Sequence, residues 1–275
     1  MSYETIKYEK EDGFCVITLN RPERLNALSL QMWQDLDSAL DEIMKDHEIK
    51  VFIFTGAPRP DGRPCFCAGA DLKEMVGTPV EGPTAPVLDW SPVSAFWAQR
   101  QPKLAVVPTF ERIAWCPKIS IAAIDGVCTA GGVELALSCD IILVSETAQV
   151  SDMHVKNLGW IGGAGATANM AWRVGVAKAI ELCCTGDVID GKEAYRIGLA
   201  NQVFPPDLLL DRAKEMARKI GGMRLAAVTM TKATCRAVQD MDRRSSWHYS
   251  DAGLAALLAE PDTAEWGPGR WVRQR

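Results

Sequence analysis

Apolar stretches of strand length alternate with an amphipathic stretch at the start of the chain, and this alternation limits the fold most strongly. Residues 15–20 predict a first strand that ends at an Arg-Pro turn. Residues 29–46 predict a helix, because Ser29 is a candidate N-cap and apolar side chains then recur every three or four residues. Residues 51–55 predict a second strand. A strand, a helix and a strand in succession are typical of an α/β protein.

The same alternation continues to about residue 205, where purely helical patterns replace it. Asp207 is a candidate N-cap and Gly221 a candidate C-terminal stop for one of these late helices. We therefore divide the chain into a mixed α/β part, residues 1–205, and a helical part, residues 206–275. Further strands are predicted at 119–125 and 140–145, and helices at 131–137, 167–184, 191–197, 207–220, 224–240 and 246–259.

A proline-rich stretch interrupts this pattern. Residues 76–110 contain six prolines and two tryptophans, Trp90 and Trp97. We expect a long irregular insertion with one helix near 93–101. Long loops in compact domains are often lids or binding loops. The insertion is therefore either a functional segment, or a surface excursion or subunit contact.

Charge and cysteine content exclude several classes of protein. The net charge is −5 over 275 residues, whereas a duplex nucleic-acid binder normally carries a basic patch. The nine cysteines include no Cys-x-x-Cys pair and there are three histidines, so we expect neither a disulfide framework nor a metal site. No apolar run approaches the roughly 18 residues that span a bilayer, and the charged N-terminus is no secretory signal. We expect a cytoplasmic protein that binds neither nucleic acid nor membranes.

Three glycine-rich segments carry the residues suited to chemistry. Residues 67–75 combine small side chains with an aspartate that can cap a following helix. Residues 124–136 predict a strand, a glycine turn and a helix with Glu134 in its first turn, where backbone N–H groups favour negative charge. Residues 152–165 begin with Asp-Met-His and end in glycines. Taken singly, each pattern is also typical of ordinary turns and caps.

In this order the segments resemble the crotonase (enoyl-CoA hydratase/isomerase) superfamily over nearly the whole chain. Residues 20–28 (Asn-Arg-Pro-Glu-Arg-Leu-Asn-Ala-Leu) are similar to its N-terminal signature, residues 66–74 to its first oxyanion segment and residues 126–140 to its second. Residues 185–205 match its downstream order. The resemblance implies a spiral of ββα units with a C-terminal helical region, residues 206–275, that packs into homotrimers, often paired as hexamers.

The resemblance also implies an acyl-CoA thioester substrate and no cofactor beyond the CoA that the substrate carries. The backbone N–H groups of Ala70 and Gly131 would form an oxyanion hole that binds the thioester oxygen as the carbonyl becomes an enolate. On the same resemblance, Lys232 would reach the ligand of a neighbouring subunit. Contacts to CoA are implied for Arg24, Leu25, Ala27, Ala68, Lys73 and Lys232.

Hydratases of this family use two glutamates, one to activate water for addition at Cβ and one to handle the proton at Cα. Glu134, three residues after Gly131, matches the first of them. Residues 150–180 contain no glutamate, so the second is replaced. We assign that role to His154, because histidine titrates near working pH. Asp152 is a further candidate that would cap a helix or orient His154.

We therefore predict an enoyl-CoA hydratase, a lyase that adds water to α,β-unsaturated acyl-CoA thioesters. With histidine as the second group, an enoyl-CoA isomerase and a C–C bond hydrolase of the same superfamily are alternatives. A non-catalytic binding protein on this scaffold is another, and an RNA binder would show salt-dependent retention on RNA. A Rossmann dinucleotide enzyme is excluded, because no Gly-x-Gly-x-x-Gly follows the first strand.

Overall fold

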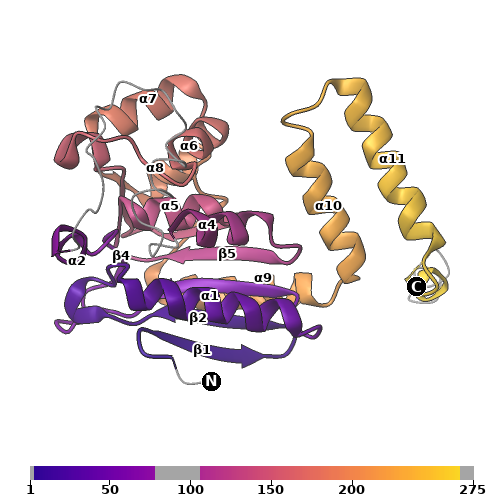
Figure 1. The fold of residues 1–275 in the computed structure, drawn as a ribbon, viewed down its shortest axis with the longest axis horizontal. Coiled ribbons are helices and arrows are strands. Elements are labelled where there is room, and N and C mark those ends of the chain that lie inside the picture. The colour runs from indigo at the N-terminus through magenta and orange to yellow at the C-terminus, as the bar shows by residue number, and fades with distance from the viewer. Residues whose placement is uncertain (1–2, 78–105, 267–275) are drawn as a thin grey trace.

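The computed structural model describes residues 3–77 and 106–266, which form two β-sheets surrounded by helices (Figure 1). The larger sheet has the strand order β1-β2-β3-β5-β7-β10. Its first two strands are antiparallel, and the other neighbours are parallel. Its strands are β1 (Ile6–Glu11), β2 (Phe14–Leu19), β3 (Val51–Gly56), β5 (Ile119–Ile124), β7 (Ile141–Ser145) and β10 (Gln202–Phe204).

Helices and helical turns connect the strands. The longest of the N-terminal ones begins as predicted, because the side chain of Ser29 accepts a hydrogen bond from the backbone N–H of Met32 at 3.1 Å. The helical segments are η1 (Pro22–Arg24), α1 (Leu30–Lys45), α2 (Leu72–Gly77), α4 (Val106–Trp115), α5 (Gly131–Ser138), η2 (His154–Leu158), α6 (Ala166–Val174), α7 (Val176–Thr185), α8 (Gly191–Arg196), η3 (Pro206–Leu208), α9 (Leu209–Gly221), α10 (Leu225–Ala237), α11 (Arg243–Ala259) and α12 (Thr263–Trp266).

Both faces of the larger sheet are buried. In β2, Cys15 belongs to a core that includes Trp33 of α1, whereas its neighbour Phe14 belongs to a second core that includes Ala213 of α9. Figure 1 shows α1 in front of these strands and α9 behind them. Burial on both faces explains why β2 and β3 are almost continuously apolar in sequence.

A smaller sheet has the order β4-β6-β8-β9. Three times the chain passes from a strand of the larger sheet to a strand of the smaller one and then to a helical segment, in β3-β4-α2, β5-β6-α5 and β7-β8-η2. Because β4, β6 and β8 are parallel neighbours, the segments that follow them emerge at one edge of this sheet. The repeated ββα pattern thus brings all three glycine-rich segments together. The strands are β4 (Cys65–Cys67), β6 (Val127–Thr129), β8 (Gln149–Ser151) and β9 (Ile189–Asp190).

The C-terminal helices fall into two groups. Helix α9 is part of the main body, because Leu209, Ala213 and Ala217 are buried against the larger sheet. Helices α10 and α11 form an antiparallel pair to one side of that body (Figure 1). In residues 3–77 and 106–266, no helix combines the length and the apolar character needed to cross a membrane.

Three sequence predictions need correction. The strand near Cys15 is not the first, because β1 precedes it; β1 is an edge strand that carries charged residues, which hides it in the sequence. The helix predicted at 167–184 is divided into α6 and α7 at Gly175, whose φ of +81° ends the first helix. Asp207 lies inside the turn η3 and does not cap α9.

The proline-rich insertion is described only at its ends. Its last residues, 106–110, form the first half of α4, a helix that the sequence did not predict. The helix expected near 93–101 and the tryptophans Trp90 and Trp97 lie outside the described residues.

Candidate active site

A buried asparagine fastens the loop after β2 to β4. Asn26 is fully buried, and its side-chain amide donates to the carbonyl oxygens of Ala57 at 2.8 Å and Cys65 at 2.9 Å. Its own oxygen accepts from the backbone N–H of Arg21 at 3.0 Å. The Arg21 side chain then donates to the carboxylate of Asp71 at 3.0 Å. These contacts hold the loop of residues 20–28 against residues 65–71.

The pairing of this loop with the oxyanion segment determines which backbone groups remain for a ligand. Leu28 pairs with Ala70 in a parallel bridge in which Leu28 donates to the Gly69 carbonyl at 2.8 Å and accepts from Asp71 at 3.0 Å. A bridge of this kind uses the groups on both sides of Ala70 and not its own N–H. Among the described residues, no hydrogen bond from the Ala70 amide is found. That N–H is available to a ligand.

Glycines bring a second N–H beside the first. Gly131 begins α5, and a Cβ placed on it would lie 3.1 Å from the Ala70 nitrogen. A Cβ on Gly69 would lie 3.0 Å from the Gly131 nitrogen. Ala130, just before the helix, has φ of 48° and ψ of −116°, a strained conformation for a residue with a Cβ. The predicted oxyanion pair, Ala70 and Gly131, is therefore brought together, with the Gly131 amide at a helix N-terminus.

Glu134 lies in the first turn of α5, as predicted. It is buried, and its Oε1 accepts a hydrogen bond from the backbone N–H of Gly163 at 2.7 Å. Burial raises the pKa of Glu134 above its ordinary value, although the positive charge of His154 and the Gly163 hydrogen bond act in the opposite direction. A carboxylate with a raised pKa suits acid–base work near neutral pH.

His154 lies directly opposite Glu134. Its Nε2 is 3.3 Å from Oε1 of Glu134, and its Nδ1 is 2.5 Å from Oδ1 of Asp152. Asp152 directly follows β8, and His154 begins the turn η2. The three side chains thus form a continuous row, Asp152–His154–Glu134. Asp152 and His154 belong to one segment of the sequence, whereas their contact with Glu134 is made only by the fold.

Opposing effects act on the two members of the row beside Glu134. Burial lowers the pKa of His154, but the hydrogen bond to Asp152 and the negative charges of Glu134 and Asp152 outweigh it, so this pKa is raised. Burial raises the pKa of Asp152, but hydrogen bonds from the side chain and backbone of His154 outweigh it, so this pKa is lowered. The row therefore favours an ionised Asp152 beside a protonated His154.

The glycine turn before α6 closes over this row. A Cβ on Gly162 would lie 3.2 Å from Oδ2 of Asp152 and 3.3 Å from Nδ1 of His154. A Cβ on Gly163 would lie 3.6 Å from Oε1 of Glu134. The glycines of the third segment therefore permit close approach to the acid–base groups.

Comparison with known proteins agrees with this geometry. The sequence profile of the enoyl-CoA hydratase/isomerase family matches residues 9–266. The chain belongs to this family. It is 35% identical to a probable enoyl-CoA hydratase of Mycobacterium bovis over 275 residues, which are 100% of this chain and 97% of that protein.

Solved structures of the family have the same fold. An enoyl-CoA hydratase from Bacillus anthracis superposes with a TM-score of 0.85 at 29% identity, covering 99% of this chain and 97% of the other. A candidate enoyl-CoA hydratase from Thermobifida fusca, solved in complex with CoA, gives 0.76 at 28% identity and covers 93% of each chain. The crotonase fold expected from the sequence is therefore confirmed, and the chain is an enzyme of this family.

Within this family member, three of the residues predicted to contact CoA lie together. The backbone N–H of Ala68 donates to the Leu25 carbonyl at 3.0 Å, and Leu25 has a left-handed φ of 54°. The Ala27 carbonyl accepts from the Arg21 side chain at 2.7 Å. Leu25 and Ala27 therefore lie beside residues 66–74, the segment that contains Ala68. Arg24 and Lys73 are exposed.

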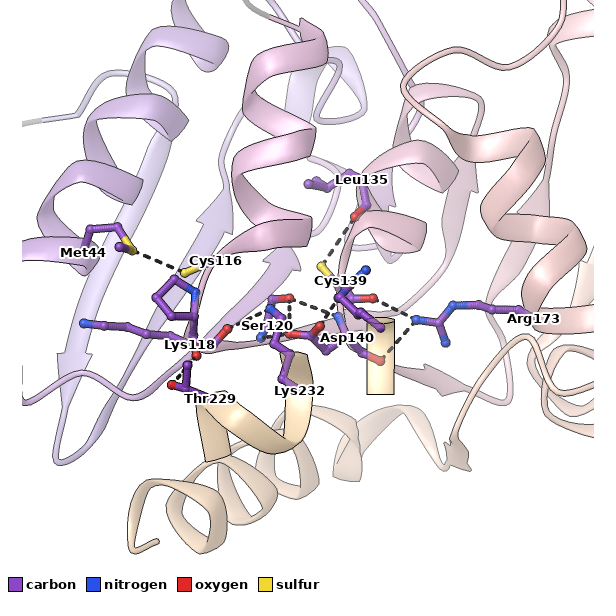
Figure 2. Close-up of polar contacts among 12 residues, drawn as sticks. Met44, Cys116, Lys118, Ser120, Leu135, Cys139, Asp140, Arg173, Thr229 and Lys232 are labelled. Carbon is purple, nitrogen blue, oxygen red and sulfur yellow. Dashed lines mark hydrogen bonds and ion pairs between the residues drawn. The ribbon is translucent and has the colours of Figure 1, made fainter. Parts of the chain in front are cut away.

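Lys232 lies elsewhere in the chain, and its predicted contact with the CoA of a neighbouring subunit stays a prediction. Its side chain is 6% exposed, and its Nζ donates to Oδ2 of Asp140 at 2.7 Å and to the Lys118 carbonyl at 3.0 Å (Figure 2). Arg236 donates to the other oxygen of Asp140 at 2.8 Å. Lys232 therefore ties α10 to the segment before β7. A buried lysine cannot be told from a ligand-binding one by its position in a helical pattern.

A cavity of about 600 Å³ lies beside this ion pair, between α10 and the main body. Asp140, Arg173 and Lys232 line it. In Figure 2, Arg173 reaches toward the backbone around Asp140, and it donates to the Cys139 carbonyl at 2.8 Å. The cavity does not include Glu134 or His154.

Proposed function

We propose that this enzyme hydrates the α,β double bond of an enoyl-CoA thioester. The observation that carries the proposal is the contact of 3.3 Å between Glu134 Oε1 and His154 Nε2, together with the neighbouring backbone N–H groups of Ala70 and Gly131. Two acid–base groups that face each other can add a proton and a hydroxyl to neighbouring carbons. The site would thus do with a glutamate and a histidine what two glutamates are expected to do in related hydratases.

The proposed reaction needs two proton transfers. The Glu134 carboxylate takes a proton from water while the water oxygen bonds to Cβ, and the π electrons of the double bond move toward the thioester oxygen. The amides of Ala70 and Gly131 stabilise the resulting enolate, and an oxyanion donor of this kind typically contributes about 3–4 kcal/mol. Protonated His154 then gives its Nε2 proton to Cα, and a 3-hydroxyacyl thioester results.

The contact between the two side chains also restores the site. After one turnover Glu134 is protonated and His154 is neutral. The proton can return from Oε1 to Nε2 over the 3.3 Å that separates them, since a transfer between two groups in contact needs no carrier. Every proton is accounted for without a metal or a redox group, and we propose that the enzyme needs no cofactor beyond the CoA of its substrate.

Exposed apolar side chains support the proposal that the enzyme is a homotrimer or a hexamer. Trp172, Val176 and Ile180 on α6 and α7 are 59–66% exposed. Trp247 on α11 is 65% exposed. Apolar surface of this extent is usually covered by another chain. We also propose a cytoplasmic location, which the nine free cysteines support.

A panel of enoyl-CoA thioesters tests the function. Straight-chain, aromatic and alicyclic substrates are incubated with the purified protein, and the products are analysed by mass spectrometry. A gain of one water in the acyl group is expected for at least one substrate. Products of unchanged mass would favour an isomerase instead, and ring opening would favour a C–C hydrolase. Tight binding without turnover would favour a binding protein.

A further inference from the structure

Asp152 is a buried carboxylate whose only ion-pair partner among the described residues is the imidazole of His154. Its side chain is 4% exposed. Oδ1 lies 2.5 Å from Nδ1 of His154 and also accepts the backbone N–H of the same residue at 3.2 Å. Hydrogen bonds to ionised groups are short and strong. The charge of Asp152 is therefore directed at one side of one ring.

The neighbouring groups that the structure describes around Asp152 add no competing positive charge. The thiol of Cys183 hydrogen-bonds to Asp152, and burial together with the charge of Asp152 raises the pKa of that thiol to about 12. Lys156, on the same turn as His154, donates instead to the Gly186 carbonyl at 3.4 Å. On the far side of the ring, the carboxylate of Glu134 contacts His154. His154 thus lies between two carboxylates.

We propose that Asp152 is a positioning residue that holds the proton of His154 on Nδ1 and presents Nε2 to Glu134 and to the substrate. This inference rests on the proposed function, because it names the residue that prepares His154 for its role. In a neutral histidine, one ring nitrogen carries the proton. Which one does so depends on the hydrogen bonds that the two nitrogens make. An ionised carboxylate at 2.5 Å can only accept, so Nδ1 must donate.

The arrangement has two consequences for the ring. Its orientation is fixed, since Asp152 binds both Nδ1 and the backbone N–H of the same residue. Its cationic form is favoured, because a negative charge lies on each side. Both help a group that must donate a proton from Nε2. A residue that only capped the turn η2 would need the backbone contact and not the ring contact.

The direct test is NMR of the whole protein labelled with ¹⁵N-histidine. The chain has three histidines, of which His47 and His248 are exposed, so the resonances of His154 can be assigned with a His154→Gln variant. In the wild-type protein we expect the neutral ring to carry its proton on Nδ1. A neutral ring protonated on Nε2 would overturn the proposal, whatever the activity of the enzyme.

The variant Asp152→Asn adds a kinetic test. We expect kcat for hydration to fall at least tenfold at pH 8 and less at pH 6, with KM within threefold, because the variant's His154 loses its proton at lower pH. The His154 titration midpoint should fall by a full pH unit or more. The exposed Asp187→Asn variant should change none of these values. An equal loss of kcat at both pH values with an unchanged midpoint would show that Asp152 acts only as a structural cap.

The two readouts separate this proposal from the proposed function. NMR needs no substrate, so the Nδ1 proton and the shifted midpoint can be present in a protein that hydrates none of the thioesters tested. In that case the hydratase proposal fails and the role of Asp152 stands. If Asp152→Asn does not fold, the wild-type NMR result alone decides.

Discussion

The carboxylate of Glu134 and the imidazole of His154 lie 3.3 Å apart although helix α5 carries the first and turn η2 the second. The smaller sheet produces this contact. Strands β6 and β8 are parallel neighbours, so the segments that follow them emerge side by side. An acid–base pair is therefore built from two separate ββα units and stays in place only while the register of these short strands is kept.

Replacing Glu134 with glutamine should stop turnover without stopping binding. The amide of Glu134→Gln keeps an oxygen for the Gly163 N–H but cannot take a proton from water. We expect kcat to fall by about 10²–10⁴-fold, the usual contribution of acid–base groups. Calorimetry should still detect binding of an acyl-CoA. The exposed Glu181→Gln variant is the control and should be fully active. Normal turnover by Glu134→Gln would contradict the assigned base.

Removing the imidazole should have a comparable effect. In His154→Ala the Cα proton has no donor at Nε2, and Glu134 has no partner to which it can return its proton. We expect kcat to fall by about two orders of magnitude or more. The measurement is the steady-state hydration rate, with the exposed His47→Ala as control. A fully active His154→Ala variant would mean that another group protonates Cα.

The pH dependence of kcat should be bell-shaped. Activity needs ionised Glu134, whose pKa is raised by burial above its ordinary value of 4.5. Activity should therefore fall as the pH drops toward that raised pKa. It also needs protonated His154, whose pKa is raised by Asp152 and Glu134 against the effect of burial. Activity should therefore decline as the pH rises through the pKa of His154, which lies above the ordinary value of 6.5. An alkaline limb centred below 6.5 would argue against His154 as the acid.

Ala130→Gly should stabilise the protein. A residue with a Cβ in the conformation of Ala130 costs about 1–3 kcal/mol, and glycine adopts it freely at an entropic cost of about 0.5–1 kcal/mol. We expect Tm to rise by roughly 2–4 °C per kcal/mol gained. Differential scanning calorimetry at one protein concentration measures this. Ala171→Gly in α6 is the control and should lower Tm. An unchanged or lower Tm for Ala130→Gly would show that this residue is not strained.

The sequence predicted the local features that depend on neighbouring residues. The Ser29 cap and the glycine turn before Glu134 are examples, because a cap or a turn is set by a few consecutive side chains. It also placed Ala70 and Gly131 together, through the resemblance to a family. Strand β1 was missed because most of its residues are charged. Helix α4 was missed because Pro108 assigned its first turn to the proline-rich insertion.

Contacts between residues that are distant in the sequence were harder to predict. The row Asp152–His154–Glu134 depends on the pairing of β6 with β8, which no local pattern encodes. The ion pair of Lys232 with Asp140 was not predicted, for the same reason. A lysine on a helix is usually solvated, and only the packing of α10 on the main body brings it to Asp140.

Lys232→Met should therefore lower the free energy of unfolding and leave substrate binding unchanged. The substitution keeps an unbranched side chain one atom shorter than lysine, but it leaves the partly buried Asp140 with Arg236 as its remaining ion-pair partner among the described residues. Removing one partner of a buried ion pair typically costs about 3–5 kcal/mol. We expect a lower Tm and a lower urea midpoint, with KM for the acyl-CoA within twofold of wild type. The exposed Lys219→Met variant should change neither. A large rise in KM with unchanged stability would instead support the predicted contact of Lys232 with the CoA of a neighbouring subunit.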